Sequence, residues 1–405
     1  MTATGACRRP ADGDQRKRRA RTMSALHDML RRHVDDGTVP GAVGLVARGD
    51  DVEVVAAGSV DTAGSAPMAR DTLFRIASLT KPVMAAAVLA LVEDGVLALA
   101  DPVAKWLPEL AEPVVVRDPA GPVDDVVPLA RPITVEDLLS SRTGWGLAAD
   151  FSLPAVRALT EVQDHGRPLQ DWPEPDVWLD RLSRVPLLHQ PGEAWLYGTS
   201  SALQGVLAAR ASGRALPEFL AERIFAPLGM RDTAFEVPAD KRDRFTSLYR
   251  PDGSGGLELV DGPDGDWTRT PAFPSGGGGL VATADDLLAF ARMLLGGGTA
   301  DGRRLLAPES VRRMTTDHLT RGQRERAALF LEGQGWGYGG AVDIAPVEPW
   351  NVPGRYGWVG GTGTTAHLVP AARPADGKVT VLLTQVSMTS PTPPPLMRAF
   401  WRATA

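Results

Sequence analysis

The stretch Thr72-Leu-Phe-Arg-Ile-Ala-Ser-Leu-Thr-Lys81 carries the most information about the fold of this chain. It runs from a short strand-like segment into an apolar helix, which the sequence predicts over residues 78–94 with Gly95 as its stop. Ser78 stands at the helix start and Lys81 three residues later, so the hydroxyl and the amine share one face of the first turn. A lysine in that place can take the serine proton and make the hydroxyl a nucleophile.

The lysine is informative because the chain has only five lysines among 43 basic residues. Arginine stays protonated in proteins, whereas a buried lysine can lose its proton and act as a base. The chain uses arginine almost everywhere else, yet a lysine follows Ser78 at this spacing. The alternative is a buried lysine on a core helix, since a pattern of two residues also arises by chance.

The composition is that of a soluble globular protein, with 43% hydrophobic and 23% charged residues among 405 and a net charge of −6. The sequence contains no run of 18 apolar residues that could span a membrane, and residues 1–22 lack the apolar core of a secretion signal. Its single cysteine, Cys7, excludes a disulfide within the chain. We therefore expect a cytoplasmic protein that does not associate with membranes, whose oligomeric state the sequence leaves open.

Residues 1–22 form a basic segment with seven basic and two acidic residues. Such a run can indicate nucleic-acid binding, but neither apolar periodicity nor an aromatic residue accompanies it. We expect a disordered tail that does not bind nucleic acid, followed by one domain over residues 23–405. Met23 begins the first helical pattern and is an alternative start of translation.

The apolar pattern predicts an α/β (α+β) protein with a sheet built from both chain ends. Strands are expected over residues 41–47, 52–58, 354–359, 364–369 and 378–386. An amphipathic helix over residues 24–36 should precede them, and a helix over about 394–404 should close the chain. Since a two-stranded hairpin is not stable alone, the first two strands should join the last three.

A mostly helical lobe should be inserted between these ends. Helices are expected over residues 135–140, 176–182, 200–211, 216–224 and 284–295. The chain would then divide into an α/β lobe of about residues 23–80 and 300–405 and a helical lobe of about residues 81–299. A ligand would bind in the cleft between them.

Two further segments could join Ser78 in a site. Tyr197 follows a tight turn and opens an expected helix, and a nearby ammonium would favour its phenolate and make it a base. A half-buried tyrosine with a satisfied hydroxyl is the alternative. In Gly357-Trp-Val-Gly-Gly-Thr-Gly-Thr364, glycines such as Gly360 would let a substrate lie against a strand, with a backbone N–H aimed at its carbonyl oxygen. A glycine-rich hairpin corner is the alternative there.

Other chemistries lack their motifs. The six histidines show no metal-ligand spacing, and no lysine follows the glycines of residues 357–363 as a phosphate loop requires. Neither a Gly-x-Ser-x-Gly elbow nor a Gly-x-Gly-x-x-Gly turn between strand and helix occurs. We therefore expect no metal and no organic cofactor.

The order Ser-x-x-Lys, Tyr-x-x, aromatic-x-Gly resembles the serine β-lactamase and penicillin-binding protein superfamily. More closely, the chain is similar to the class C β-lactamase-related serine hydrolases, which include carboxylesterases and acyltransferases. The likeness covers nearly all of residues 23–405, and its matching stretches are residues 73–81, 133–144, 191–195, 224–230 and 276–285. It implies a β-lactamase/transpeptidase-like fold with an antiparallel sheet flanked by helices.

The resemblance also implies roles for single residues. Ser78 would be the acylated nucleophile, and Lys81 and Tyr197 would act together as the general base. The backbone N–H groups of Ser78 and Gly361 would form the oxyanion hole. The reaction would be acyl transfer from a small-molecule ester or amide through an acyl-Ser78 intermediate.

The chain departs from the family pattern at two positions. Thr199 stands where the second motif usually has asparagine, and Trp358 stands where the third motif usually has lysine or histidine. Together with Gly360, both are expected to contact substrate, with Trp358 as an apolar wall for an uncharged group. We predict a carboxylesterase. The alternatives are a β-lactamase or D-alanyl-D-alanine peptidase, an acyltransferase and, more remotely, a non-catalytic binding protein.

Overall fold

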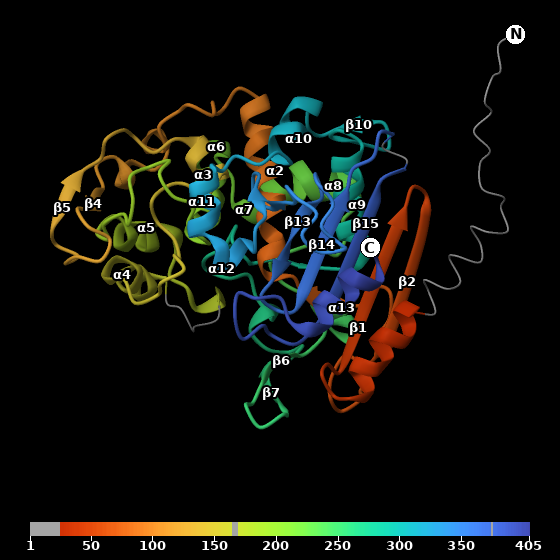
Figure 1. The fold of residues 1–405 in the computed structure, drawn as a ribbon. Helices are drawn as coiled ribbons and strands as arrows, with labels where there is room; N and C mark the ends of the chain where they lie inside the picture. The colour runs from red at the N-terminus through yellow and green to blue at the C-terminus, as the bar shows by residue number, and fades with distance from the viewer. Residues whose placement is uncertain (1–24, 164–168, 374–375) are drawn as a thin grey trace, which may run out of the picture.

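A computed structural model describes residues 25–163, 169–373 and 376–405, with a seven-stranded antiparallel sheet at its centre (Figure 1). The strand order is β11-β12-β13-β14-β15-β1-β2. The strands are β1 (Gly41–Arg48), β2 (Asp51–Gly58), β11 (Gly335–Trp336), β12 (Ala341–Val342), β13 (Tyr356–Gly360), β14 (Thr364–Val369) and β15 (Lys378–Thr384). The expected basic tail of residues 1–22, with Cys7, lies outside the described residues.

The sheet joins the two ends of the chain. β1 pairs antiparallel with β15 from Ala42 opposite Thr384 to Arg48 opposite Lys378, and β2 follows as the edge strand. The α/β class with one antiparallel sheet from both chain ends is therefore confirmed. β11 and β12 were not predicted, because two residues are too few to show the alternation of a strand.

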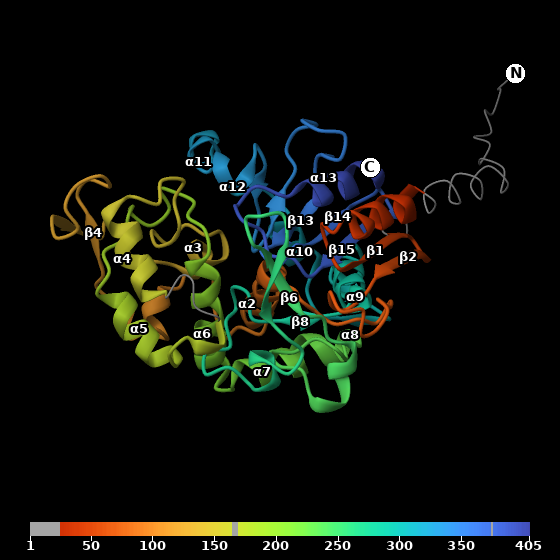
Figure 2. The same ribbon diagram turned by 90° about the horizontal axis from the view of Figure 1, so that it is seen from below.

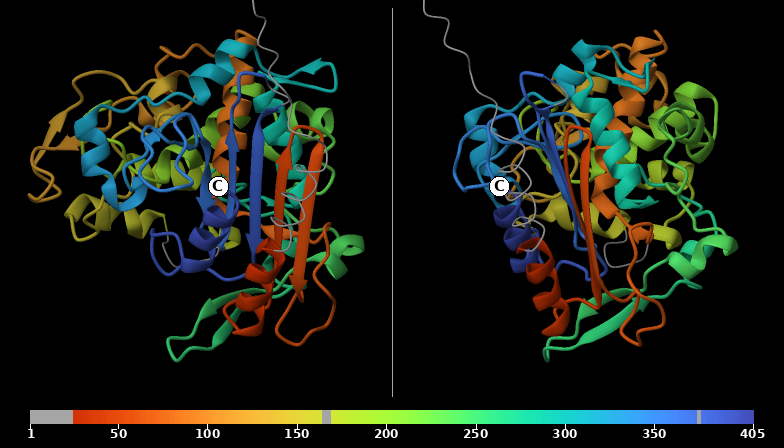
Figure 3. Two further views of the ribbon diagram at one scale, coloured as in Figure 1. Left: turned by 45° about the vertical axis from the view of Figure 1, so that its right-hand side comes forward. Right: turned by 90° about the vertical axis from the view of Figure 1, so that its right-hand side faces the viewer.

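The helix over residues 25–35 and α13 (Pro395–Ala403) lie side by side on one face of the sheet (Figure 3). Their apolar sides, with Leu30 and Phe400, pack against β1 and β15 in one buried cluster. A Cβ atom built on Gly44 of β1 would lie 3.1 Å from Leu30 and 3.5 Å from Phe400, so this glycine lets both helices approach closely. The two helices predicted at the ends of the domain are confirmed.

α2 (Thr80–Glu93) and α9 (Ala284–Leu295) lie on the opposite face of the sheet (Figure 2). Every residue from Thr80 to Leu91 is buried, because α6 (Thr199–Ser212) packs against the side of α2 that faces away from the sheet. A helix that is apolar all round belongs in the interior, as the sequence predicted for this one. α2 starts after a short 3₁₀ turn, η1 (Ala77–Leu79).

Smaller elements fill the rest of the chain. Between α2 and α9 lie α3 (Val135–Leu139), α4 (Pro154–Val162), α5 (Pro175–Ser183), α6, α7 (Leu216–Leu220) and α8 (Ala226–Leu228). The sequence did not predict the hairpins β4–β5 (Val114–Val116, Val126–Pro128), β6–β7 (Leu248–Pro251, Leu257–Asp261) and β9–β10 (Thr299–Ala300, Arg303–Arg304), or the short helices α10 (Pro308–Met314), α11 (Arg321–Arg326) and α12 (Ala328–Leu331). Within the described ranges, the helices are too short or too polar to cross a bilayer.

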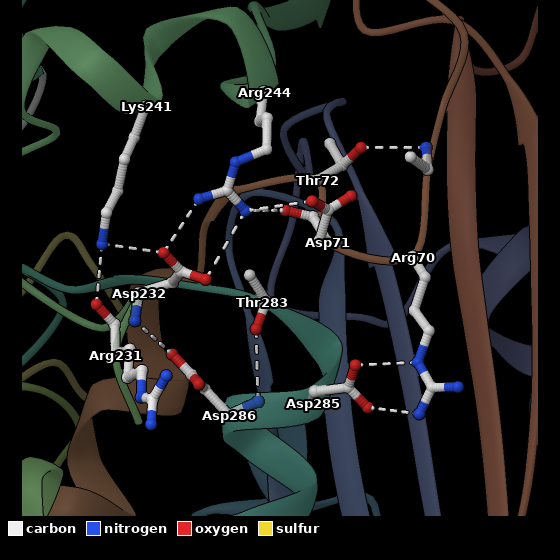
Figure 4. A network of polar contacts seen from close by, with 11 residues as sticks. Arg70, Asp71, Thr72, Arg231, Asp232, Lys241, Arg244, Thr283, Asp285 and Asp286 are labelled. Carbon is white, nitrogen blue, oxygen red and sulfur yellow. Dashed lines mark hydrogen bonds and ion pairs between the residues drawn. The ribbon is translucent and has the colours of Figure 1, made fainter. Parts of the chain in front are cut away.

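A network of charged side chains ties the start of α9 to the segment that leads toward Ser78 (Figure 4). Arg244 contacts both Asp71 and Asp232. Asp286, in the first turn of α9, accepts hydrogen bonds from the Asp232 N–H at 3.0 Å and the Thr233 hydroxyl at 2.8 Å. Burial raises the pKa of Asp286 to about 6, because the carboxylate loses its hydration.

Candidate active site

Ser78 lies where a strand turns into the buried helix α2. The strand β3 (Phe74–Arg75) pairs with β8 (Val281–Ala282), and η1 connects it to α2. Ala77 has a φ of +45°, a left-handed conformation that costs a residue with a Cβ atom about 1–3 kcal/mol. This strained bend leaves Ser78 half-buried at the start of the helix.

Lys81 is the second residue of α2, and its amine lies against Ser78. Its Nζ donates to Ser78 Oγ at 2.8 Å and to the carbonyl oxygen of Gly277 at 2.5 Å. The residue is 3% exposed. Burial lowers the pKa of its ammonium because the charged form loses its hydration, while Tyr197 acts in the opposite direction. A lysine with a lowered pKa is suited to accept a proton near neutral pH.

Tyr197 brings a phenol to the same serine from the segment before α6. Its Oη donates to Ser78 Oγ at 2.8 Å, and its ring centroid lies 4.8 Å from Lys81 Nζ. Reciprocal backbone bonds of 2.9 and 3.0 Å with Leu147 fix this segment, and Gly198 then turns the chain into α6 with a φ of +98°. The Lys81 amine and the Tyr197 phenol, both expected from the sequence, therefore contact the same atom, Ser78 Oγ.

Trp358 lies in the site, but it is buried against other aromatic side chains and does not form the expected apolar wall facing substrate. The indole is 4% exposed and packs edge-on against Trp336, with 4.7 Å between ring centroids. Its Nε1 donates to Tyr197 Oη at 3.0 Å. The phenol oxygen therefore has the indole N–H as one partner and Ser78 Oγ as another. The residue that was expected to contact substrate thus contacts the catalytic candidate Tyr197.

Aromatic rings surround the phenol of Tyr197, and the sequence analysis missed them. The Phe330 ring stacks on it at 5.0 Å between centroids, and Trp195 lies at 5.9 Å. Trp336 lies behind them, 5.1 Å from Trp195. An apolar wall of this kind strengthens the hydrogen bonds beside it by lowering the local dielectric. Trp195 stands two residues before Tyr197, so the sequence alone could have placed it near the phenol. Phe330 and Trp336 come from segments without a recognisable pattern.

Thr199 is not available to a substrate in this structure. The residue is fully buried, and its hydroxyl accepts a hydrogen bond from Gln163 Nε2 at 2.7 Å. Gln163 is itself 4% exposed and was not recognised from the sequence. The pair instead links the start of α6 to the end of α4, so the expected contact between Thr199 and substrate finds no support in the geometry.

The two glycines of the expected oxyanion segment have different surroundings. A Cβ atom on Gly360 would lie 2.4 Å from the Ile76 carbonyl oxygen, so this glycine permits a close approach between two backbones and not one by substrate. Gly361 is exposed, with nothing within 4 Å of a Cβ atom built on it. It lies in the turn after β13, where its N–H can face a ligand.

The assembled groups place one hydroxyl between an amine and a phenol, both of which can exchange protons with it. This arrangement suits nucleophilic attack by Ser78 Oγ on an acyl carbon. Across the described ranges, His, Cys, Asp and Glu side chains form no group of three or more that could hold a metal ion.

Comparison with known proteins places this geometry in a family context. The beta-lactamase family model matches residues 26–399. Protein Rv1367c of Mycobacterium tuberculosis is 41% identical over 353 residues, which cover 85% of this chain and 86% of the relative. Esterase EstB of Burkholderia gladioli is 33% identical over 317 residues, which cover 74% of both chains.

Solved structures show the same fold. EstCE1, described as a hydrolase with promiscuous acyltransferase activity, matches with a TM-score of 0.76 over 95% of this chain and 98% of that chain, at 24% identity. At this identity the likeness concerns the fold alone. The expected β-lactamase-like fold, with its sheet flanked by helices, is therefore confirmed.

Proposed function

The chain belongs to the beta-lactamase family and is a serine hydrolase, and we propose that it acts as a carboxylesterase on esters of small carboxylic acids. The observation that carries the proposal is the Ser78 Oγ atom, which lies 2.8 Å from both the Lys81 amine and the Tyr197 phenol. The likeness to EstB, a protein named as an esterase, supports ester hydrolysis over the other reactions of the family.

In the acylation step, Lys81 and Tyr197 together take the Ser78 proton while Oγ forms a bond to the ester carbonyl carbon. Negative charge moves to the former carbonyl oxygen, which the N–H groups of Ser78 and Gly361 stabilise by about 3–4 kcal/mol per donor. The bond to the alkoxy group then breaks. The alcohol leaves with the proton that the Lys81–Tyr197 pair received, and the acyl group stays on Ser78.

In the deacylation step, water takes the place of the alcohol. The same Lys81–Tyr197 pair removes a proton from the water as its oxygen attacks the acyl carbon. The tetrahedral intermediate collapses, the bond to Ser78 Oγ breaks, and the pair returns its proton to the serine. The carboxylic acid leaves, and the site is ready for a second turnover.

The residues of β13 favour a neutral ester over a β-lactam. Lysine or histidine usually occupies the position of Trp358 in the resembled β-lactam-cleaving enzymes, and here the indole N–H is engaged by Tyr197. β13 (Tyr356–Gly360) therefore has no cationic side chain for a substrate carboxylate. Losing a charge-assisted hydrogen bond costs about 1.5–3 kcal/mol, and a neutral ester makes no such demand.

Steady-state kinetics with short-chain 4-nitrophenyl esters, a penicillin and a chromogenic cephalosporin test this proposal. We expect kcat/KM for the best ester to exceed that for either β-lactam by about 10- to 150-fold, the equivalent of that loss. Cephalosporin hydrolysis as fast as the best ester would contradict the proposal and favour a β-lactamase. An added alcohol that becomes acylated in preference to water would instead identify an acyltransferase.

A further inference from the structure

The oxyanion hole of the proposed reaction depends on two segments that lie far apart in the sequence. One N–H group comes from Ser78, which follows β3, and the other from Gly361, in the turn between β13 and β14. β3 belongs to a separate two-stranded sheet with β8, whereas β13 and β14 belong to the large sheet. Strand pairing between β3 and β13 therefore does not set the distance between the two N–H groups.

Two threonine hydroxyls connect these segments. Thr362 Oγ1 donates to the Arg75 carbonyl oxygen at 2.5 Å, and Thr364 Oγ1 donates to the Ile76 carbonyl oxygen at 3.1 Å. The Ile76 oxygen also accepts the Leu79 N–H at 3.1 Å, within its own segment, so the Thr364 hydroxyl is a second donor that joins it to the turn that carries Gly361. Thr364 is fully buried, so water does not replace its hydroxyl.

Both connected segments are held firmly on their own sides. The carbonyl oxygen of Gly361 accepts the Met388 N–H at 2.7 Å, and the Gly363 N–H donates to the Gly360 oxygen at 3.0 Å. On the serine side, the Thr80 hydroxyl donates to the Ala77 oxygen at 2.7 Å. Each N–H group thus sits in a fixed local structure. The two threonine bonds and the close approach of Gly360 to the Ile76 carbonyl join these structures, and the threonine bonds are the side-chain hydrogen bonds among these contacts.

We propose that Thr362 and Thr364 are positioning residues that set the separation of the Ser78 and Gly361 N–H groups. Neither threonine touches a reacting atom, since both act through the carbonyl groups of Arg75 and Ile76. The inference rests on the proposed function, because that function makes these N–H groups the oxyanion hole. A loosened hole weakens binding of the transition state more than binding of the substrate, so kcat should fall while KM stays nearly constant.

Thr362→Val and Thr364→Val test the inference, because valine keeps the shape and removes the donor. We expect kcat on a 4-nitrophenyl ester to fall about 10- to 100-fold, since the donors remain present but misplaced. KM should change less than threefold. Affinity for a boronic acid, which forms a tetrahedral adduct with the serine, should fall in parallel with kcat. Thr362→Ser and Thr364→Ser keep the hydroxyl and should retain kcat within threefold.

Thr404→Val is the matched control. Thr404 is 2% exposed, and its hydroxyl donates to the Phe400 carbonyl oxygen at 2.9 Å, at the end of α13. Each of the three valine variants removes a hydrogen bond and should lower Tm, but Thr404→Val should leave kcat unchanged. The inference is overturned if Thr362→Val and Thr364→Val keep wild-type kcat and boronic-acid affinity, or if Thr404→Val loses as much kcat. If the inference fails but a fluorophosphonate still labels Ser78 of the wild type, the proposed function is unaffected. If the wild type is not labelled, the proposed function and the inference are both overturned.

Discussion

Lys81 and Asp286 are both buried titratable residues, yet only the first has the surroundings of a catalytic group. Burial lowers the pKa of Lys81 and raises that of Asp286 to about 6, because loss of hydration disfavours the charged form of each. Lys81 Nζ contacts Ser78 Oγ, which also contacts the phenol of Tyr197. The amine therefore has a partner whose proton it can take.

Asp286 has partners of another kind. Its carboxylate accepts the Asp232 N–H and the Thr233 hydroxyl, which hold a loop against the start of α9 (Figure 4). Neither is a nucleophile beside a base. The comparison shows that a shifted pKa identifies a catalytic group only together with the chemistry of its neighbours. Substitutions around Lys81 should change turnover, whereas substitutions at Asp286 should change stability.

The largest effect should come from Ser78→Ala. Without the nucleophile, the variant should lose at least about 10³-fold in kcat and all covalent labelling by a fluorophosphonate. Tm should stay close to that of the wild type, because Ser78 is half-buried and its hydroxyl contributes only to the site. Ester hydrolysis within a few-fold of the wild type would remove Ser78 from the mechanism.

Lys81→Arg should be nearly as damaging, because it keeps the charge and removes the base. We expect kcat to fall by about 10²- to 10³-fold, and the larger guanidinium should also lower Tm in this 3%-exposed position. Lys105→Arg provides the control, since Lys105 pairs with Asp101 at the surface. Turnover by Lys81→Arg at the level of Lys105→Arg would mean that Tyr197 alone serves as the base.

Trp358→Phe should have a smaller effect on the same site. It removes the indole N–H that donates to Tyr197 Oη at 3.0 Å, so the phenol loses a contact that holds it against Ser78. We expect kcat/KM on a 4-nitrophenyl ester to fall about tenfold.

Trp336→Phe is the matched control for that variant. Trp336 packs against Trp358, but its Nε1 has no hydrogen-bond partner within the described part of the chain. Removing that N–H should leave kcat/KM close to the wild-type value. If both variants lose kcat/KM equally, the effect comes from aromatic packing, and the hydrogen bond from Trp358 is not important.

The sequence was sufficient for the parts of this structure that depend on local patterns. Apolar segments bounded by turn residues predicted the strands at both chain ends, and the apolar run after Ser78 predicted a helix that is buried on every side. The spacing of Ser78 and Lys81 fixes their contact within one helical turn, so it was predictable as well.

Contacts between distant segments were harder to predict. The sequence suggested that Trp358 contacts substrate. Whether its indole faces a ligand or the phenol of Tyr197 depends on how β13 lies against the segment before α6. The burial of Thr199 depends in the same way on Gln163 from another helix. The hairpin β6–β7 was not predicted because β7 (Leu257–Asp261) is exposed or half-buried along its whole length, so no buried face marks it in the sequence.

The smallest effect on turnover should come from Asp286→Asn, whose effect should appear in stability instead. The folded-state pKa of about 6 lies above the ordinary value of 3.8, so between these pH values the folded protein holds a proton that the unfolded chain has lost. The free energy of unfolding of the wild type should therefore fall as the pH rises from about 4 to about 6, by roughly 2–3 kcal/mol. Asparagine keeps an acceptor for the Asp232 N–H without the charge, so the variant should lose this pH dependence.

Urea unfolding at several pH values distinguishes this group from its neighbour. Asp285 lies one residue earlier on α9, where its exposed carboxylate bonds to Arg70 at 2.8 Å (Figure 4). Such a surface pair contributes about 0–1 kcal/mol, so Asp285→Asn should follow the wild-type pH curve with a small constant offset. Asp286→Asn should match the wild type near pH 4 and exceed it most above pH 6, because only there does the wild type bury an unprotonated carboxylate. Curves for both variants that run parallel to the wild type would show that the start of α9 tolerates the charge of Asp286.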